Sequence, residues 1–389
     1  MHAPTPGRPE LYVESGRQAL TLIARWCRSR GIELALLPSY HCDSMALPFW
    51  LEGMRVHFVG VGNDLQFSPD ALNSALANLD ETAVVLWARV GAIAASPELA
   101  EALGRARRVG HLVVDDATHA VLDDEFSGRD QAPMPITDFR IASLRKLIPV
   151  TDGALLRCRP GITLDPPRER TCLDDDLVIS RSTLLAKAAS LNSATPLPLA
   201  SSSGSGSGQH SPVPPRRAEG YLEQLSDSEG FFDRALTPVP MSRGARSQLS
   251  SFDLGRQARR ERRANRLFAE ELERQSSAHH AHDGTSRPPQ TPGIGTIEVL
   301  NAGRACFPLI RTSAAAAVEE ALVTRGLFSP QSWPRPDYLP SHLEWPSDVL
   351  SIDCGQSRTT EQIRQIAEIV YQASLSPAGD LPREHSPGH

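Results

Sequence analysis

The sequence predicts an α/β protein: a three-layer sandwich with a mainly parallel sheet, followed by a smaller α+β domain. Apolar strand segments alternate with segments of helical periodicity over about the first 160 residues. The strand segments Val84-Val85-Leu86 and Leu112-Val113-Val114 are apolar on both faces, which is typical of a parallel sheet covered by helices on both sides. The pattern changes after about Leu173, and helix and strand segments alternate again over residues 296–372.

The first half of the chain supplies the elements of the parallel sheet and its helices. Ser15-Gly16 has the form of a helix N-cap and tight turn, and apolar residues then recur at helical spacing up to Trp26. Further helices are predicted at residues 45–50, 68–77 and 96–108, and strands at residues 34–38, 55–59, 82–87, 111–115 and 154–157.

The chain is expected to divide into a large domain at residues 11–180 and a small domain at residues 247–373. Residues 181–246 are the predicted connection, and its Ser/Gly-rich part at about 200–217 has nothing to bury and is expected to be disordered. Residues 1–10 and 374–389 are also expected to be disordered. In the second half, helices are predicted at 181–191, 247–275, 314–325 and 360–371, and strands at 305–310 and 349–352.

Composition and charge exclude several classes of function. The 389 residues include 40% hydrophobic and 22% charged residues, and a formal net charge of -6 gives no basic footprint for nucleic acid. The Arg-rich run 256–266 includes Glu261, which favours a solvated helix face over nucleic-acid binding. No apolar run approaches the roughly 18 to 20 residues that cross a bilayer, so no membrane segment is expected.

The cysteines and the chain start predict a cytoplasmic protein without a metal site. Residues 1–10 are Pro-rich and polar, so no signal peptide is expected. Six cysteines are scattered without a Cys-x-x-Cys pair, which indicates reduced thiols and neither a disulfide frame nor a zinc site. The histidine cluster at 279–282 has no neighbouring Cys or acidic framework to complete a metal site.

Lys146 is a candidate for covalent chemistry. Among 40 Lys+Arg residues, only Lys146 and Lys187 are lysines. An amine can lose its proton and form an imine with a carbonyl, whereas a guanidinium stays charged. Lys146 lies in the apolar, Pro-flanked segment 140–154, and the alternative interpretation is a surface lysine at a loop edge.

Two further patterns fit a phosphorylated aldehyde cofactor. The helix start Ser15-Gly16-Arg17 offers free backbone N–H groups to a phosphate, and Ser143, three residues before the lysine, is placed to reach the same phosphate. Asp116 ends an apolar strand, where a carboxylate can hold a protonated pyridine nitrogen. The alternative for Asp116 is an acid that caps the next helix.

Four motifs occur in order along the first half. They are Ser-Gly-Arg-x-Ala-Leu from Ser15, Leu-Pro-Ser-Tyr-His-Cys from Leu37, Val-Asp-Asp-Ala-Thr-His-Ala from Val114, and Ser-Leu-Arg-Lys-x-x-Pro-Val-x-Asp-Gly from Ser143. Together they resemble the fold-type I PLP-dependent aminotransferases, and more narrowly the DegT/StrS-like sugar aminotransferases. The similarity covers about residues 11–160 and returns at 307–308, 333–334 and 350–356.

The resemblance implies a pyridoxal 5'-phosphate (PLP) cofactor and a role for each motif residue. Lys146 would form the internal aldimine and later carry the proton between Cα and C4′. Asp116 would pair with the pyridine nitrogen, and His119 would lie near the phenolic side of the ring. Tyr40 or His41 would stack on the ring, and the sequence does not choose between them. The phosphate would be surrounded by Ser15, Gly16, Arg17 and Ser143.

The implied activity is transfer of an amino group from an amino acid, with glutamate the expected donor, to a keto group of a nucleotide-linked sugar or a related small carbonyl compound. Relatives usually form homodimers, and a homodimer is expected here. Neighbouring Arg145 and partial burial are expected to lower the pKa of Lys146.

The sequence also departs from the family pattern. Gly153 stands where many relatives have two glycines, and residues 354–358 differ from the usual run in the small domain. The departures leave two alternatives, a PLP enzyme of another reaction type in natural-product biosynthesis and a non-catalytic binding or scaffold relative. A dehydratase of this family typically has His in place of the lysine, so Lys146 argues against that subtype.

Overall fold

The computed structural model describes residues 10–124, 136–193, 223–224, 227–232, 236–282, 297–327, 333–355 and 358–375. The Ser/Gly-rich stretch at about 200–217, expected to be disordered, lies outside these residues, as do 1–9 and 376–389. Two residues expected to be disordered belong to regular elements, since Glu10 begins a strand and Ser374 ends a helix.

A seven-stranded sheet forms the centre of the larger part of the molecule. Its order is β1-β7-β6-β5-β4-β2-β3. The strands are β1 (Glu10–Val13), β2 (Leu34–Pro38), β3 (Arg55–Val59), β4 (Ala83–Ala88), β5 (Leu112–Asp116), β6 (Phe139–Ser143) and β7 (Ala154–Cys158). The neighbours from β3 to β6 pair in parallel, and β7 runs antiparallel to both β6 and β1. The predicted mainly parallel sheet is confirmed, although β1 and β6 were not predicted as strands.

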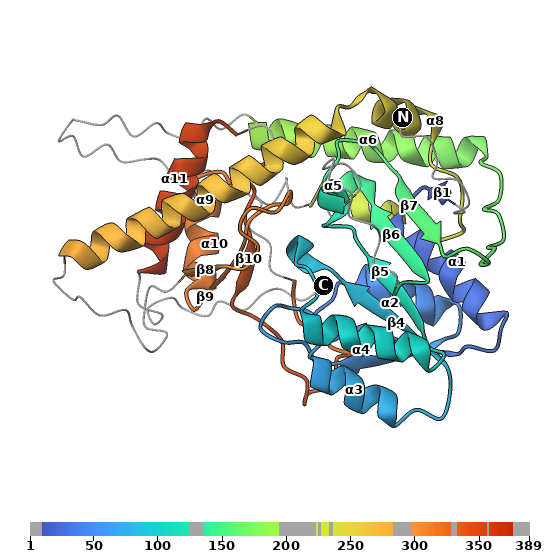
Figure 1. Cartoon of the computed structure of the whole chain (residues 1–389). Helices are drawn as coiled ribbons and strands as arrows, with labels where there is room; N and C mark the ends of the chain where they lie inside the picture. The colour runs from blue at the N-terminus through green and yellow to red at the C-terminus, as the bar shows by residue number, and fades with distance from the viewer. Residues whose placement is uncertain are drawn as a thin grey trace.

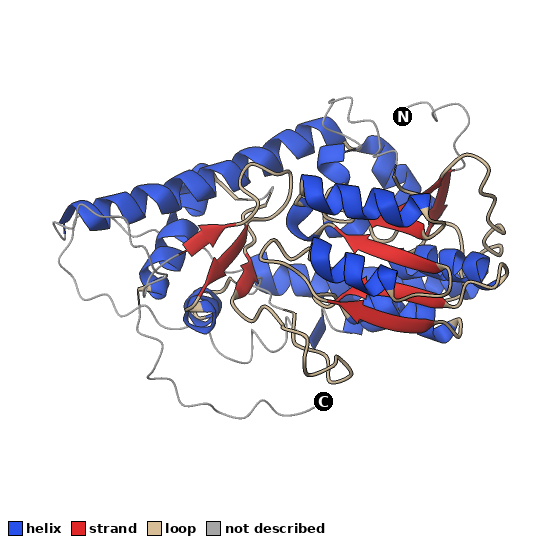
Figure 2. Cartoon of the chain, turned by 60° about the horizontal axis from the view of Figure 1, so that its bottom comes forward, coloured by secondary structure: helices blue, strands red, loops and turns tan. Residues whose placement is uncertain are grey.

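Helices cover both faces of this sheet and make three layers (Figure 2). Helices α1 (Gly16–Arg28) and α2 (Asp43–Leu51) lie on one face, and α3 (Pro69–Ala77) and α4 (Pro97–Arg108) lie on the other. Because strand side chains alternate between faces, Ala35 and Leu37 of β2 join the core under α1, whereas Leu34 and Leu36 join the core under α4. This double burial explains why the strand sequences are apolar throughout.

Serine caps start the helices where the sequence predicts them. The Oγ atoms of Ser15, Ser68 and Ser96 accept hydrogen bonds from backbone N–H groups three residues later, at 3.2, 3.4 and 3.1 Å. Pro69 and Pro97 occupy the first turns of α3 and α4, where a missing N–H has no cost.

A second, smaller body lies beside the first (Figure 1). Its three-stranded antiparallel sheet has the order β10-β9-β8, with β8 (Ile297–Val299), β9 (Leu309–Thr312) and β10 (Val349–Ser351). Helices α10 (Ala315–Val323) and α11 (Thr360–Ser374) pack there, and α9 (Leu254–His282) runs from the large sheet to this body. Phe268 and Leu272 of α9 enter its core beside Ile366 of α11.

The single helix predicted at 247–275 is wrong. The structure has α8 (Arg243–Ser251) and then α9, because Phe252 is extended (φ -83°, ψ 135°) and the Asp253 carboxylate accepts the N–H of Arg256 at 2.8 Å. Such an Asp is a helix N-cap, and it ends one helix and begins the next. Both bounds of the helix predicted at 181–191 also shift, since α6 (Cys172–Ser193) begins nine residues earlier and ends two residues later.

The strand predicted at 305–310 begins only at Leu309. The residues before it turn around the buried side chain of Asn301. Its amide donates to the carbonyls of Gly91 (2.8 Å) and Phe307 (2.9 Å), and its oxygen accepts the N–H of Leu309 (2.8 Å). The apolar residues of this stretch indicate correctly that it is buried. Its backbone does not form a strand, because it is held in a turn by the hydrogen bonds of the Asn301 side chain.

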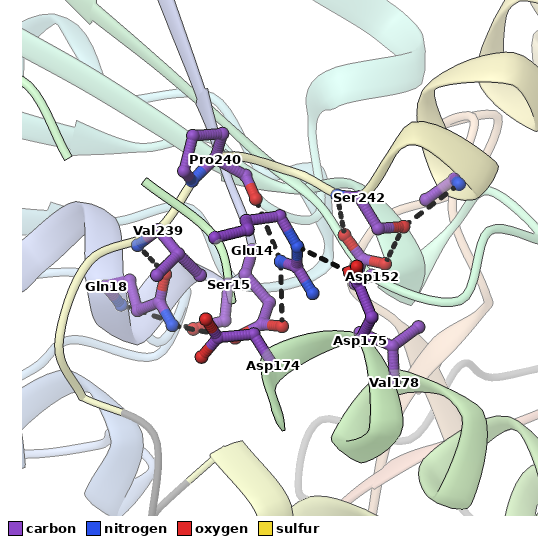
Figure 3. Close-up of polar contacts among 12 residues, drawn as sticks. Glu14, Ser15, Gln18, Asp152, Asp174, Asp175, Val178, Val239, Pro240 and Ser242 are labelled. Carbon is purple, nitrogen blue, oxygen red and sulfur yellow. Dashed lines mark hydrogen bonds and ion pairs between the residues drawn. The ribbon is translucent and has the colours of Figure 1, made fainter. Parts of the chain in front are cut away.

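A buried polar network fixes the chain just before α1 (Figure 3). Arg170 donates to Glu14 at 3.2 Å, and Gln18 donates to the other oxygen of Glu14 at 2.8 Å. Asp152 accepts the N–H and the hydroxyl of Ser242 at 2.9 and 2.6 Å. These bonds join the end of β1 to α1 and to the segment before α6, and they join the turn before β7 to the segment before α8.

The described residues contain neither a membrane-spanning helix nor a metal-binding cluster. None of their helices is long and apolar enough to cross a membrane. No group of three or more His, Cys, Asp or Glu side chains in the same part of the chain is placed to hold a metal ion.

Candidate active site

A cavity of about 500 Å³ opens where the parallel strands end. Ser15 follows β1, Tyr40 follows β2, Asp116 ends β5 and Ser143 ends β6, and all four line the cavity. Ligands of open parallel sheets bind at this carboxyl edge, because the loops and helix N-termini meet there. The fold therefore brings together residues that are up to 128 positions apart, counted from Ser15 to Ser143.

Eight of the nine residues predicted for the site line the cavity: Ser15, Gly16, Arg17, Tyr40, Asp116, His119, Ser143 and Lys146. His41 does not line it. Its ring is 1% exposed, stacks on Phe58 with centroids 4.6 Å apart, and bonds the hydroxyl of Tyr338 at 2.9 Å.

Tyr40 belongs to an aromatic wall of the cavity. Its ring centroid is 5.0 Å from those of Trp333 and Trp345, which come from the C-terminal half. Burial raises the pKa of the Tyr40 phenol to about 12, so the hydroxyl stays protonated at neutral pH. Of the two aromatic candidates in this loop, the structure therefore places only Tyr40 beside the cavity.

The start of α1 forms an anion-binding end of the cavity. Free N–H groups and the helix dipole favour a negative charge at this point. A Cβ added to Gly16 would lie 3.4 Å from the Cβ of Ser143, so the two backbones approach each other closely. This approach brings the hydroxyl of Ser143 to the helix start.

Three cations and one carboxylate complete this end. Both terminal nitrogens of Arg145 donate to Glu229, at 2.5 and 2.6 Å. Arg17 lies 3.5 Å and Lys146 4.0 Å from the same carboxylate. Glu229 also lines the cavity. The sequence does not indicate it as a site residue, because it lies in a polar stretch far from Lys146 along the chain and belongs to no motif.

Lys146 lies in the 3-10 turn that follows β6, and its side chain is 46% exposed where it borders the cavity. The neighbouring Arg145 charge, followed by burial, lowers the pKa of Lys146 to about 8, and Glu229 opposes the shift. With a pKa near 8, about a tenth of the amines are neutral at pH 7. The predicted influence of Arg145 is thus present in the structure.

Asp116 and its donor Thr118 form the acidic end of the cavity. Asp116 is 6% exposed, and burial raises the pKa of its carboxyl to about 6. Its described hydrogen-bond donor is Thr118, whose N–H lies 3.0 Å from Oδ1. The preceding carboxylate, Asp115, has a charged partner: it accepts a hydrogen bond from Arg140 at 2.8 Å, on the side of the strand away from the cavity. A cation placed in the cavity beside Asp116 would therefore be stabilised.

His119 lines the cavity next to Trp333 of the aromatic wall. Its Nδ1 accepts the N–H of Gly91 at 3.2 Å, and its ring meets Phe307 edge-on with centroids 4.9 Å apart. Burial, and then the charge of Lys146, lower the pKa of His119 to about 4. The imidazole is therefore neutral, and its Nε2–H is available as a donor.

These features fit a phosphorylated pyridine aldehyde. The buried Asp116 suits a protonated ring nitrogen, the start of α1 with Arg17 suits a phosphate, and Lys146 supplies an amine of lowered pKa in the same cavity.

Solved structures share the arrangement of the chain. The aminotransferase TlmJ from Streptoalloteichus hindustanus superimposes with a TM-score of 0.55 at 18% identity, over 94% of this chain and 85% of that one. The chain has the aminotransferase fold. No protein-family model and no curated protein matches the sequence.

Two further structures share this aminotransferase fold. Spr1654 of Streptococcus pneumoniae, described as a sugar aminotransferase and solved in its PLP-form, gives a TM-score of 0.56 at 13% identity, over 94% of this chain and 86% of that one. DesI, solved in the presence of its TDP-sugar product, gives 0.56 at 14% identity, over 95% and 81% of the two chains. At these identities the likeness establishes the fold.

Proposed function

We propose that this chain is a PLP-dependent aminotransferase. The observation that carries the proposal is the one cavity that Lys146, Asp116 and the start of α1 line together. The proposed reaction transfers an amino group from an amino acid, with glutamate as the proposed donor, to a keto group of a nucleotide-linked sugar or a related small carbonyl compound. A homodimer is proposed as the working form.

Each end of the cavity would hold one end of the cofactor. Ser15, Gly16 and Ser143, with Arg17, would bind the phosphate, and Asp116 would bind the protonated ring nitrogen. When bound, PLP supplies an electron sink that stabilises a carbanion next to the substrate nitrogen. Asp116 maintains that property, because a carboxylate beside the nitrogen keeps the ring protonated.

Lys146 has two tasks in this proposal. As a neutral amine it holds the cofactor covalently, and once released it accepts and returns the substrate proton. Its pKa of about 8 suits both tasks, since a general base works best when its pKa lies near the working pH. The Nε2–H of His119 would donate to the phenolic side of the bound ring, and the rings of Tyr40 and Trp333 would keep bulk water from one side of the cavity.

The proposed sugar acceptor is supported by the structures that share the fold. DesI is solved with a TDP-sugar product and Spr1654 is described as a sugar aminotransferase. Spr1654 is solved in a PLP-form and also in a PMP-form.

Absorbance of the purified protein tests the proposal. Addition of PLP should give a band near roughly 410–430 nm that borohydride removes while leaving the label on the protein. Glutamate should then convert this band and release 2-oxoglutarate, and a panel of keto-sugars should restore it. A coloured protein that releases no 2-oxoglutarate from glutamate would indicate a different PLP reaction. A protein that stays colourless would favour a non-catalytic scaffold.

A further inference from the structure

The anion-binding end of the cavity already holds an anion that belongs to the chain. Glu229 forms a two-point pair with Arg145, at 2.5 and 2.6 Å, and its carboxylate also lies 3.5 Å from Arg17 and 4.0 Å from Lys146. Its carboxylate is thus close to three cations that line the cavity. Two of them are consecutive residues after β6, and the third lies at the start of α1. A planar carboxylate on a guanidinium fork uses the same donors that a phosphate uses.

Neighbouring residues hold the segment 227–232 in this position. Phe232 is 2% exposed and lies between two guanidinium groups, with the Cζ atoms of Arg145 and Arg181 at 4.4 and 4.1 Å from its ring centroid. Ser228 is fully buried. Cation–π contacts of this kind stabilise the aromatic ring between the two charges. The carboxylate of Glu229 is therefore presented to the cavity by a packed segment.

A bound phosphate and Glu229 compete for the same charges. Because both terminal nitrogens of Arg145 donate to Glu229, a phosphate can form the same two-point pair with this guanidinium only when the carboxylate leaves. A phosphate carries up to two negative charges, and a carboxylate a few ångströms away repels it strongly in a partly buried site. Arg145, Lys146 and Arg17 also hold the pKa of Glu229 at about 2 despite its burial, so the carboxylate stays charged at neutral pH.

We infer that Glu229 is a built-in competitor of the cofactor phosphate. In the cofactor-free chain its carboxylate pairs with Arg17 and Arg145, and it must move off these cations when a phosphorylated cofactor binds beside Arg17. The inference rests on the proposed function, because it takes PLP as the incoming ligand. It assigns to the segment 227–232 a regulatory role: this segment sets how tightly the chain retains its cofactor.

Affinity measurements with two ligands test the competition. The cofactor-free full-length chain and its Glu229→Gln variant are titrated with PLP and with pyridoxal, which carries the aldehyde but no phosphate. Glutamine keeps the size of the side chain and removes its charge, so the dissociation constant for PLP should fall roughly tenfold or more, as expected when the Glu229 carboxylate no longer competes. The dissociation constant for pyridoxal should change much less, which separates the phosphate effect from any effect on the Lys146 amine.

Glu223→Gln is the matched control, since Glu223 is an exposed glutamate six residues earlier. This variant should bind PLP like the unchanged chain. Unchanged or weaker PLP binding by Glu229→Gln overturns the inference, because Glu229 would then support the bound phosphate or ignore it. If the unchanged chain and the variant both fail to bind PLP, the proposed function fails together with the inference.

Hydrogen exchange supplies a readout that does not depend on the substitution. Addition of PLP to the unchanged chain should increase amide exchange in a peptide that covers 227–232, because Glu229 loses its two hydrogen bonds to Arg145. Pyridoxal should leave this exchange nearly unchanged. Increased protection of 227–232 on PLP addition would overturn the inference.

Discussion

At one end of the cavity Asp116 is buried with Thr118 as its described donor, whereas at the other end Arg17, Arg145 and Lys146 surround the carboxylate of Glu229. Burial dominates at the first end and raises the pKa of Asp116 to about 6. Neighbouring charges dominate at the second end and lower the pKa of Glu229 to about 2. The acidic end would therefore be stabilised by a cation that a ligand supplies, whereas the charges of the cationic end are already compensated by a carboxylate of the chain.

The largest effect should follow from removing the amine at the cationic end. Lys146→Ala should abolish the absorbance band and the borohydride-stable label completely, because no other described residue of the cavity lining has an amine that can form an imine. Lys187→Ala, which changes the other lysine of the chain, is the matched control and should keep both signals. A label that persists in Lys146→Ala would contradict this assignment, since the amine that binds the cofactor would then lie elsewhere in the chain.

Asp116→Asn tests the acidic end through stability. A carboxyl whose pKa rises from 3.8 to about 6 on folding favours the folded state fully below pH 3.8, and this contribution is lost as the pH rises through 6. The cofactor-free variant should therefore be more stable than the unchanged chain by up to about 3 kcal/mol at pH 8, and by much less at pH 4. Urea unfolding at the two pH values measures this. A difference that does not depend on pH would show that Asp116 is not strained by burial.

The same substitution should also reduce catalysis, because an asparagine cannot keep a pyridine nitrogen protonated. We expect the rate of conversion by glutamate to fall by a factor on the order of a hundred or more. Stopped-flow absorbance of the loaded protein measures it, with Asp115→Asn as the neighbouring comparison, because Asp115 pairs with Arg140 away from the cavity.

Arg145→Leu tests the cationic end through the pKa of Lys146. The adjacent guanidinium is the largest cause of the lowered pKa, so its removal should raise the pKa from about 8 by about one unit or more. The rate of pyridoxal binding, which follows the neutral amine, should then reach its midpoint at a higher pH. Arg25→Leu removes an exposed arginine on α1 and should leave the midpoint in place. A midpoint that stays near 8 in Arg145→Leu would assign the shift to burial.

The smallest effect concerns Thr118, which joins the two ends. Its N–H donates to Asp116 at 3.0 Å, and its hydroxyl accepts the N–H of Ser143 at 3.0 Å. Thr118→Val keeps the shape and leaves the Ser143 N–H without this partner, so the free energy of unfolding should fall by about 1 kcal/mol. Thr183→Val on the exposed side of α6 is the control. Equal effects of both variants would mean that Thr118 does not connect the ends.

The parts of the fold that the sequence predicts well are those governed by local rules. The strands at 34–38 and 55–59 appear at the predicted residues, and Ser68 and Ser96 cap helices where predicted, because apolar strands and serine caps act over a few neighbouring residues. The errors occur where contacts with residues distant in the sequence determine the backbone conformation. Asn301 holds residues around 300–308 in a turn through bonds to Gly91 and Phe307, and no local pattern shows that.

The candidate site divides in the same way. Ser15-Gly16, Asp116 and Lys146 could be selected from the sequence because each lies in a motif at a strand end or a helix start, where chain direction fixes the position of a side chain. The choice of Tyr40 over His41 at the cavity wall was left open by the sequence and depends on contacts with Trp333 and Tyr338 more than 290 residues later. Glu229 could not be selected at all.

The sequence by itself determined the parallel sheet, the helix starts that border its carboxyl edge, and the rare lysine that follows β6, since these depend on residue type and short spacing. Only the tertiary structure decided which charges meet. Arg145 and Glu229 are 84 positions apart, and their pairing depends on how a distant segment packs through Phe232. Coulomb interactions depend on distance in space and on burial, and neither quantity can be read from the order of residues along the chain.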